Sequence, residues 1–369
     1  MDKHTETPFH QRLSFNLISL ALIVTGLYIG KDLILPLLFS ILLANLLLPI
    51  TNYLQRRKFN KTFSIIIPLL FAIIVAGGLL YFLSSQIIKF MDDVPDLQKR
   101  FNEVSRSFQV WFREGTSITI RKQNQYLHDT VGDLKDKAPV LMKMTVTSLT
   151  GILSYVVLMP LYTFLILYYR STIKSFLISV FKDAAEQNVK EVLTESTTIA
   201  QKYLTGLLIE TSLVFALNMI GFLSVGIKYA VFLALLAALL NLIPYVGMLV
   251  ANVLCMMITL VSSDVMSNVL WVGVILALVQ FLDNNFGMPL IVGNKVRINA
   301  LVTILGVLVG GALCGIPGMF LAIPGLAVLK VIFDKVPELK PWGLLLGDNQ
   351  DNQTDHVTSK TVSSSTESE

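Results

Sequence analysis

Residues 229–261 are apolar on both sides of a centre at residues 241–247, with no charged side chain between Lys228 and Asp264. One straight helix of this length would be about 50 Å long, whereas the hydrocarbon core of a bilayer is about 30 Å thick. Pro244, near the middle, lacks an amide hydrogen, and Gly247 permits a sharp turn. The pattern predicts two short helices that enter a membrane and return as a re-entrant hairpin. One long, tilted and Pro-kinked helix is the alternative.

Residues 300–336 repeat this pattern, because they are too long for one membrane span and short for two. Glycines interrupt the centre, and small residues there allow helices or a solute to approach the backbone closely. They are Gly310, Gly311, Gly315 and Gly318, and Pro317 lies among them. We expect a second hairpin here, entered from the cytoplasm. A role in helix packing alone is the alternative for the glycines.

Six other apolar segments are each long enough for one complete membrane span. They are residues 14–30, 33–53, 63–83, 149–169, 203–226 and 265–282, and a polar turn at residues 30–32 is expected between the first two. Four positive charges in the short loop 55–61 place that loop, and with it the N-terminus, in the cytoplasm. Two more in the loop 293–297 favour the same side if residues 229–261 form a re-entrant hairpin.

Three polar segments are expected outside the bilayer. Residues 84–148 predict a helical arm with an apolar stripe, which packs either within the protomer or against a neighbouring subunit. Residues 181–201 predict a charged helix on the cytoplasmic surface, and the tail has a disordered composition. The predicted domains are transmembrane helices (1–83), the arm (84–148), a transmembrane helix with the surface helix (149–202), a two-hairpin region (203–346) and the tail (347–369).

The composition supports a polytopic membrane protein, because 54% of the residues are hydrophobic and only 15% are charged. A net charge of +4 gives no sign of nucleic-acid binding. Cys255 and Cys314 lie in apolar segments without the spacing of a metal site or a disulfide framework. The sequence contains no zinc-protease, serine-hydrolase or ATP-binding motif, so we expect no enzyme and no cofactor or metal.

A repeated order of elements appears in the second half of the chain. One span and a hairpin (203–261) are followed by another span and a hairpin (265–336), and the two spans run in opposite directions. Inverted repeats with discontinuous helices are typical of secondary transporters, in which solutes bind where the breaks meet near the midplane. The predicted fold is therefore all-α, with about six full spans and two broken re-entrant hairpins in inverted repeat.

Helix ends at the two breaks leave backbone amides and carbonyls free to bind polar groups. The candidate solute pathway comprises Asn241, Pro244, Tyr245, Gly247, Gln280, Asp283, Asn284, Asn285, Gly310, Gly311, Gly315 and Pro317. Asp283 is the strongest candidate for coupling to protons or sodium, and a loop carboxylate or helix cap is the alternative. Glu210 lies within a predicted span and is the second such candidate, unless its side chain reaches water.

Several motifs together resemble the autoinducer-2 exporter family of bacterial permeases. They are residues 203–206 (YLTG), 226–230 (GIKYA), 242–247 (LIPYVG), 283–289 (DNNFGMP) and the glycine pattern from 310 to 324, and the likeness covers most of residues 10–345. Recurrent motif positions of that family are Pro244, Gly247, Asp283, Pro289, Gly311, Gly315 and Pro324, so Pro289 joins the candidate pathway. Met248 and Leu207 depart from the family pattern, which has a second proline and a polar residue at those positions.

The resemblance implies an oligomeric permease of the bacterial inner membrane, a pentamer, in which a mobile transport region moves against a scaffold. Both termini are expected in the cytoplasm. The partners would be the lipid bilayer, a small polar solute and further copies of the chain. Three hypotheses remain: a secondary transporter that exports a small polar solute, a sodium/proton antiporter that uses Asp283 and Glu210, and a non-transporting membrane scaffold whose arm binds partners.

Overall fold

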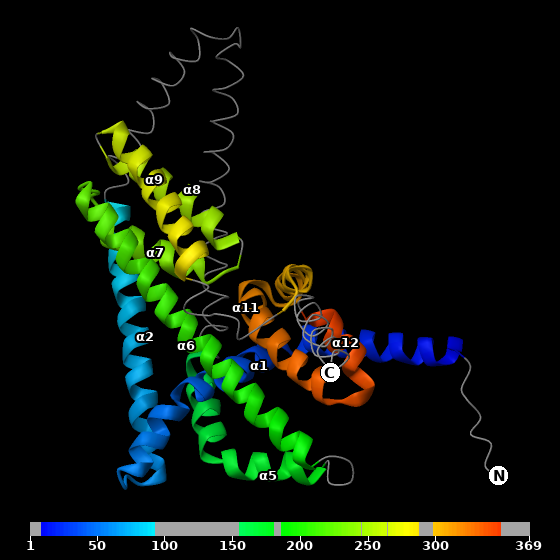
Figure 1. The fold of residues 1–369 in the computed structure, drawn as a ribbon. Helices are drawn as coiled ribbons and strands as arrows, with labels where there is room; N and C mark the ends of the chain where they lie inside the picture. Colours follow the sequence, from blue (N-terminus) through cyan, green and yellow to red (C-terminus); the bar gives the residue numbers. More distant parts are fainter. Residues whose placement is uncertain are drawn as a thin grey trace, which may run out of the picture. The chain divides into compact units, whose positions relative to one another are not determined.

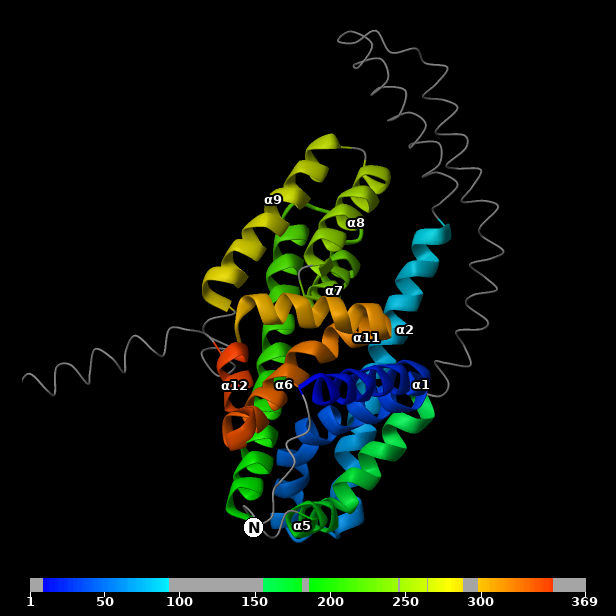
Figure 2. The same cartoon turned by 90° about the vertical axis from the view of Figure 1, so that its right-hand side faces the viewer.

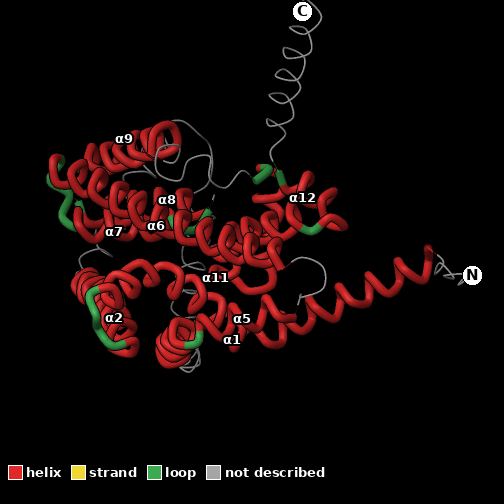
Figure 3. The backbone as a smooth tube through the Cα atoms, turned by 60° about the horizontal axis from the view of Figure 1, so that its bottom comes forward, coloured by secondary structure: helices red, strands yellow, loops and turns green. Residues whose placement is uncertain are grey.

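The computed structural model describes residues 9–92, 155–180, 186–244, 246–263, 265–287 and 298–347 (Figure 1). These residues are almost entirely helical, and within them no strand is present, only an isolated bridge between Ile298 and Gly347 (Figure 3). The predicted all-α class is confirmed for this part of the chain. The chain divides into two compact units, residues 1–48, 158–201 and 295–369 in the first and residues 49–157 and 202–294 in the second.

The N-terminal helices differ from the prediction at one point. Helix α1 (Phe9–Arg56) is continuous, so the polar turn predicted at residues 30–32 is wrong. A single glycine costs a helix only about 1 kcal/mol relative to alanine, so Gly30 is too weak a signal to end the helix. A turn does connect α1 to α2 (Lys61–Asp92) within the predicted basic loop, where Lys58 adopts a positive φ of 65°.

A second boundary is also absent. The predicted surface helix at residues 181–201 and the predicted span at 203–226 were expected to be separate, but α6 (Glu186–Ser224) is one helix of 39 residues. The change from polar to apolar sequence near residue 202 lacks a helix-breaking residue, and the backbone therefore continues. A true bend of 68° separates the helix Tyr155–Tyr168 from α5 (Arg170–Val180).

The second unit contains a helical hairpin within residues 229–261. Helices α7 (Ala230–Asn241) and α8 (Val246–Ser262) pack side by side, with α9 (Met266–Leu282) against α8 (Figure 2). The Sγ atom of Cys255 lies 3.7 Å from the carbonyl oxygen of Leu233, and Gly247 rests against the backbone of Leu240. One long kinked helix would hold these pairs apart, so that alternative is wrong. The buried core of this hairpin includes Phe222, Phe232, Leu233, Ala251, Val272 and Leu276.

The first unit contains the second hairpin, within α11 (Ala300–Lys335). Gly315 has non-helical angles (φ 66°, ψ −150°), and the chain folds back there into two arms (Figure 2). Gly306 faces Leu326, and the backbones of Gly310 and Gly318 touch so closely that a Cβ atom on either would collide with the other. Helix α12 (Lys340–Leu346), preceded by the short helix η3 (Pro337–Leu339), packs against α11.

Five described helices are long and apolar enough to cross a membrane, or six if the bent pair of 155–168 and 170–180 counts as one span. Exposed apolar side chains fit that reading. On α9 they form one outward face, which contains Leu270, Val274, Leu278 and Phe281. A face of this kind is costly in water and suits lipid. The chain is therefore a multi-pass membrane protein.

Candidate functional site

Three polar side chains meet inside the second unit. They are Glu210 on α6, Asn241 at the end of α7, and Asp283, the first residue of the π-helix η1 (Asp283–Gly287). Glu210 and Asp283 are each only 5% exposed. The Nδ2 atom of Asn241 donates a hydrogen bond to Oδ2 of Asp283 at 3.4 Å, and the carboxyl group of Glu210 lies close to that of Asp283.

Helix packing explains why these three residues meet. A small apolar cluster joins Val214 of α6, Ala238 of α7 and Val279 of α9, all of them buried. Each polar residue lies three or four positions from one member of this cluster: Glu210 before Val214, Asn241 after Ala238 and Asp283 after Val279. Residues at that spacing share a helix face. The apolar contact therefore places the polar side chains together one helical turn farther along.

The π-helix shapes the acidic end of this cluster. Helix α9 continues into five π-helical residues, a geometry that is rare and is often found at functional sites. Gly287 is the last of them, and a Cβ atom there would lie 2.6 Å from Oδ1 of Asp283. Glycine at this position therefore leaves the space that the Asp283 carboxyl group occupies.

The ionisable groups of this cluster are both acidic, and no basic group among the described residues pairs with them. Two carboxyl groups are buried next to each other, and within the described residues neither forms an ion pair with Lys, Arg or His. Oε2 of Glu210 and Oδ1 of Asp283 also lack a hydrogen-bond donor in the described part of the chain. Burying a polar atom without a partner costs about 1–3 kcal/mol. The cluster is thus able to accept a proton or a hydrogen-bond donor.

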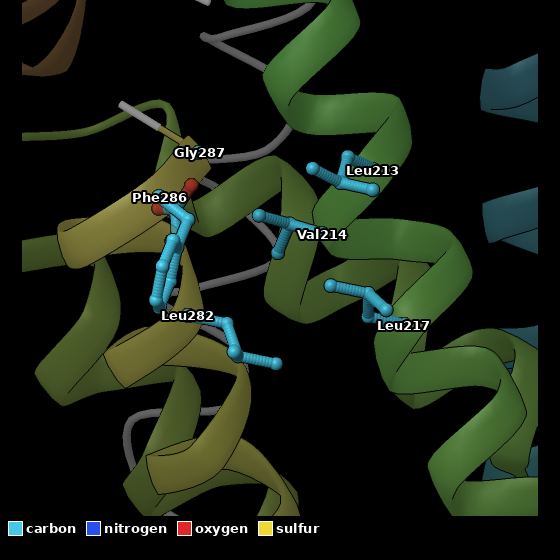
Figure 4. Close-up of a pocket in the computed structure, with 7 residues that line it drawn as sticks. Leu213, Val214, Leu217, Leu282, Phe286 and Gly287 are labelled. Atoms are coloured by element: carbon cyan, nitrogen blue, oxygen red, sulfur yellow. The ribbon is translucent and has the colours of Figure 1, made fainter. Parts of the chain in front are cut away.

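A cavity of about 290 Å³ lies beside Asp283 (Figure 4). One wall comes from α6, and the other comes from the end of α9 and from η1. Its lining residues are Leu213, Val214, Leu217, Leu282, Asp283, Phe286 and Gly287. Small-molecule sites are mostly apolar, contain a few convergent polar groups and have volumes of about 300–1,000 Å³. This cavity is slightly smaller than that range. Asp283 is the one ionisable residue among its described lining residues, and the accessible wall is apolar.

The structure brings together only some of the predicted pathway residues. Gln280 donates to Asn284 at 3.0 Å, and Asn285 donates to the carbonyl of Phe281 at 2.8 Å. Asn284 and Asn285 are exposed and make these local bonds, apart from the Glu210–Asp283 pair. Pro244 lies in the break between α7 and α8, and Gly247 is the second residue of α8. Tyr245 and Pro289 lie outside the described residues, as does most of the predicted arm.

The other predicted pathway residues belong to the α11 hairpin. Gly315 is its turn, Pro317 begins its second arm, and Gly310 and Gly311 pack against that arm, on Gly318 and Met319 respectively. These contacts account for the glycines by close packing. Among the described residues, no group of three or more His, Cys, Asp or Glu side chains could hold a metal ion.

Sequence reasoning missed the apolar walls of the cavity and Gly287. The signal for the walls was present, because Leu213, Val214 and Leu217 follow Glu210 at helical spacing on α6. Gly287 had no such signal. Its role depends on the π-helical backbone, which the sequence did not indicate.

Comparisons with known proteins identify a family of transporters. The model of the AI-2E family transporters matches residues 17–338. YrrI of Bacillus subtilis, described as a candidate transport protein, is 24% identical over 316 residues, covering 82% of this chain and 86% of that protein. MT0215 of Mycobacterium tuberculosis, described in the same way, is 24% identical and covers 93% of each chain.

PerM of Escherichia coli K12, described as a candidate permease, is 25% identical over 336 residues, covering 86% of this chain and 92% of that protein. The family match extends over both hairpins and over the buried carboxyl pair. The chain therefore belongs to the AI-2E family of membrane transporters.

Proposed function

We propose that the protein is a secondary transporter of the bacterial inner membrane that exports a small polar solute, such as an autoinducer-2-like signal molecule. One observation carries this proposal: the break between α7 and α8 presents Asn241 to the buried carboxyl of Asp283, and a cavity lies beside that residue. Ionisable groups within membrane spans are costly and mark solute or ion pathways.

The order of the described helices also supports a transporter. A long helix and a hairpin (α6, then α7 and α8) precede a second long helix and hairpin (α9, then the two arms of α11). We propose that these form two inverted repeats, that both hairpins are re-entrant, and that their breaks line one solute pathway. Backbone amides and carbonyls at the breaks would bind the solute without a fixed charge.

Three further features belong to the same proposal. The protein assembles as a homo-oligomer, a pentamer, and both termini lie in the cytoplasm. Native mass spectrometry from detergent gives the number of subunits, and tags on the two termini report their side. A mass equal to that of one subunit would contradict the homo-oligomer. A tag accessible from outside the cell would contradict the cytoplasmic position of that terminus.

The test of function is efflux from proteoliposomes that contain the full chain. Vesicles are loaded with a panel of labelled polyhydroxylated solutes, sugars and neutral amino acids, and efflux is followed with and without gradients of protons or sodium. We expect efflux of one chemical class above that from protein-free vesicles. Sodium/proton exchange without any solute movement would favour the antiporter hypothesis, and no movement of solute or ion would favour the scaffold.

A further inference from the structure

We infer that Glu210 and Asp283 share a single proton, and that this proton is exchanged for the exported solute at Asp283. The inference rests on the proposed export function and adds the coupling ion and the residues that carry it. It is drawn from the geometry of the second unit, where two buried carboxyl groups from α6 and η1 interact beside a cavity.

The first argument concerns charge. Two carboxylates close together in a medium of low dielectric repel each other, and each also loses its hydration on burial. No cation among the described residues offsets them. The groups that face the pair are Asn241 from α7, which is neutral, and Tyr203 from α6, which interacts with Glu210. A proton held between the two carboxyl groups removes one of the two negative charges.

The second argument concerns hydrogen bonds. Asn241 supplies a donor to Oδ2 of Asp283, whereas Oδ1 of Asp283 and Oε2 of Glu210 have no donor among the described residues. Both side chains are buried, and each is only 5% exposed. One shared proton provides the missing donor. A sodium ion fits less well, because hard cations need about six oxygen ligands and this cluster offers fewer.

The third argument connects the pair to transport. Asp283 also borders the cavity, whose accessible wall is apolar. A turn of this side chain toward the cavity would bring the carboxyl group that holds the proton to a hydroxyl group of a bound solute. If the proton and the solute compete for this carboxyl group, each lowers the affinity of the protein for the other by the same factor. Binding of the solute would release the proton, and return of the proton would release the solute. Export would then be driven by protons that enter the cell.

The pair itself is tested by infrared difference spectroscopy of the full-length protein in lipid nanodiscs, titrated from acid to alkaline pH. The carbonyl stretching band of a protonated carboxyl should be present in the wild type, shift in D₂O and be lost in both Glu210→Gln and Asp283→Asn. Glu195→Gln is the matched control, because Glu195 lies on the same helix with its side chain 48% exposed and should leave the band unchanged. Absence of the band from the wild type, or its survival in both variants, overturns the shared proton without any reference to transport.

The coupling is tested by efflux of whichever solute the panel identifies. In the wild type, an inward proton gradient should increase the efflux rate at least tenfold. In Glu210→Gln and Asp283→Asn the gradient should have no effect, while Glu195→Gln should respond like the wild type. If the efflux rate of the wild type is the same with and without the proton gradient, the coupling is overturned but the export function is not. If no solute of the panel moves at all, the export function fails, and the infrared band alone still decides whether the pair shares a proton.

Discussion

The side-chain amide of Asn241 donates a hydrogen bond to Oδ2 of Asp283 at 3.4 Å, which joins the last residue of α7 to the first residue of η1 across 42 positions of sequence. This bond connects the tip of the α7–α8 hairpin to the acidic end of the cavity. Movement of the hairpin would therefore alter the surroundings of Asp283 directly.

Removing this donor should impair transport. In Asn241→Leu, Oδ2 of Asp283 loses its partner, and an unpaired buried acceptor costs about 1–3 kcal/mol. A loss of 1.4 kcal/mol corresponds to about tenfold in an equilibrium constant, so we expect efflux to fall by about tenfold or more. Asn285→Ala is the control, because Asn285 is exposed and donates a local hydrogen bond to the carbonyl oxygen of Phe281. Equal effects of the two substitutions would argue against a role for the Asn241–Asp283 bond.

Gly287→Ala should displace the carboxyl group of Asp283. The added methyl group would lie 2.6 Å from Oδ1, well inside van der Waals contact, so the side chain must rotate or the π-helix must shift. We expect a marked loss of efflux with a decrease in thermal stability of about 1–3 kcal/mol.

The control for this substitution is Gly78→Ala on α2, where the added carbon meets nothing within 4 Å. That variant should be as stable as the wild type or slightly more stable, because alanine favours a helix by about 1 kcal/mol over glycine. Thermal unfolding in detergent measures both variants. If Gly287→Ala transports normally, the position of the Asp283 carboxyl is unimportant for function.

The α11 hairpin should depend on the contact between Gly310 and Gly318. Gly318→Val places side-chain atoms where the Gly310 backbone now lies, and the arms must separate. We expect a loss of stability of several kcal/mol, within the range of severe overpacking. Gly325→Ala on the same arm is the control, because nothing lies within 4 Å of its added carbon. Comparable unfolding temperatures for the two variants would contradict close packing at Gly310.

Single cysteines can test whether each hairpin is re-entrant. In a background with Cys255→Ala and Cys314→Ala, Lys228→Cys and Ser263→Cys flank α7 and α8, and Ile298→Cys and Val336→Cys flank α11. A membrane-impermeant thiol reagent applied to each side of sealed vesicles should label both members of a pair from the same side, and the two pairs from opposite sides. Labelling of one pair from opposite sides would show that its hairpin crosses the bilayer and would remove the inverted repeat.

The sequence by itself determined the class of the protein and the position of its breaks. The density of apolar residues requires helices in lipid, because every backbone group there must bond within its own segment. Pro244 and the glycine-rich centre of residues 300–336 marked the two places where the chain folds back. Proline lacks the amide hydrogen that a helix needs, and glycine readily adopts the positive φ found at Gly315.

Only the tertiary structure decided which polar residues meet. Asn284 and Asn285 belong to the same predicted pathway as Asp283, yet the π-helical turn buries Asp283 and leaves its two neighbours exposed. Glu210 joins Asp283 because Val214 and Val279 pack in one apolar cluster, a contact between residues 65 positions apart. Helical periodicity gives the face on which a side chain lies, but only the packing of one helix on another decides what that face meets.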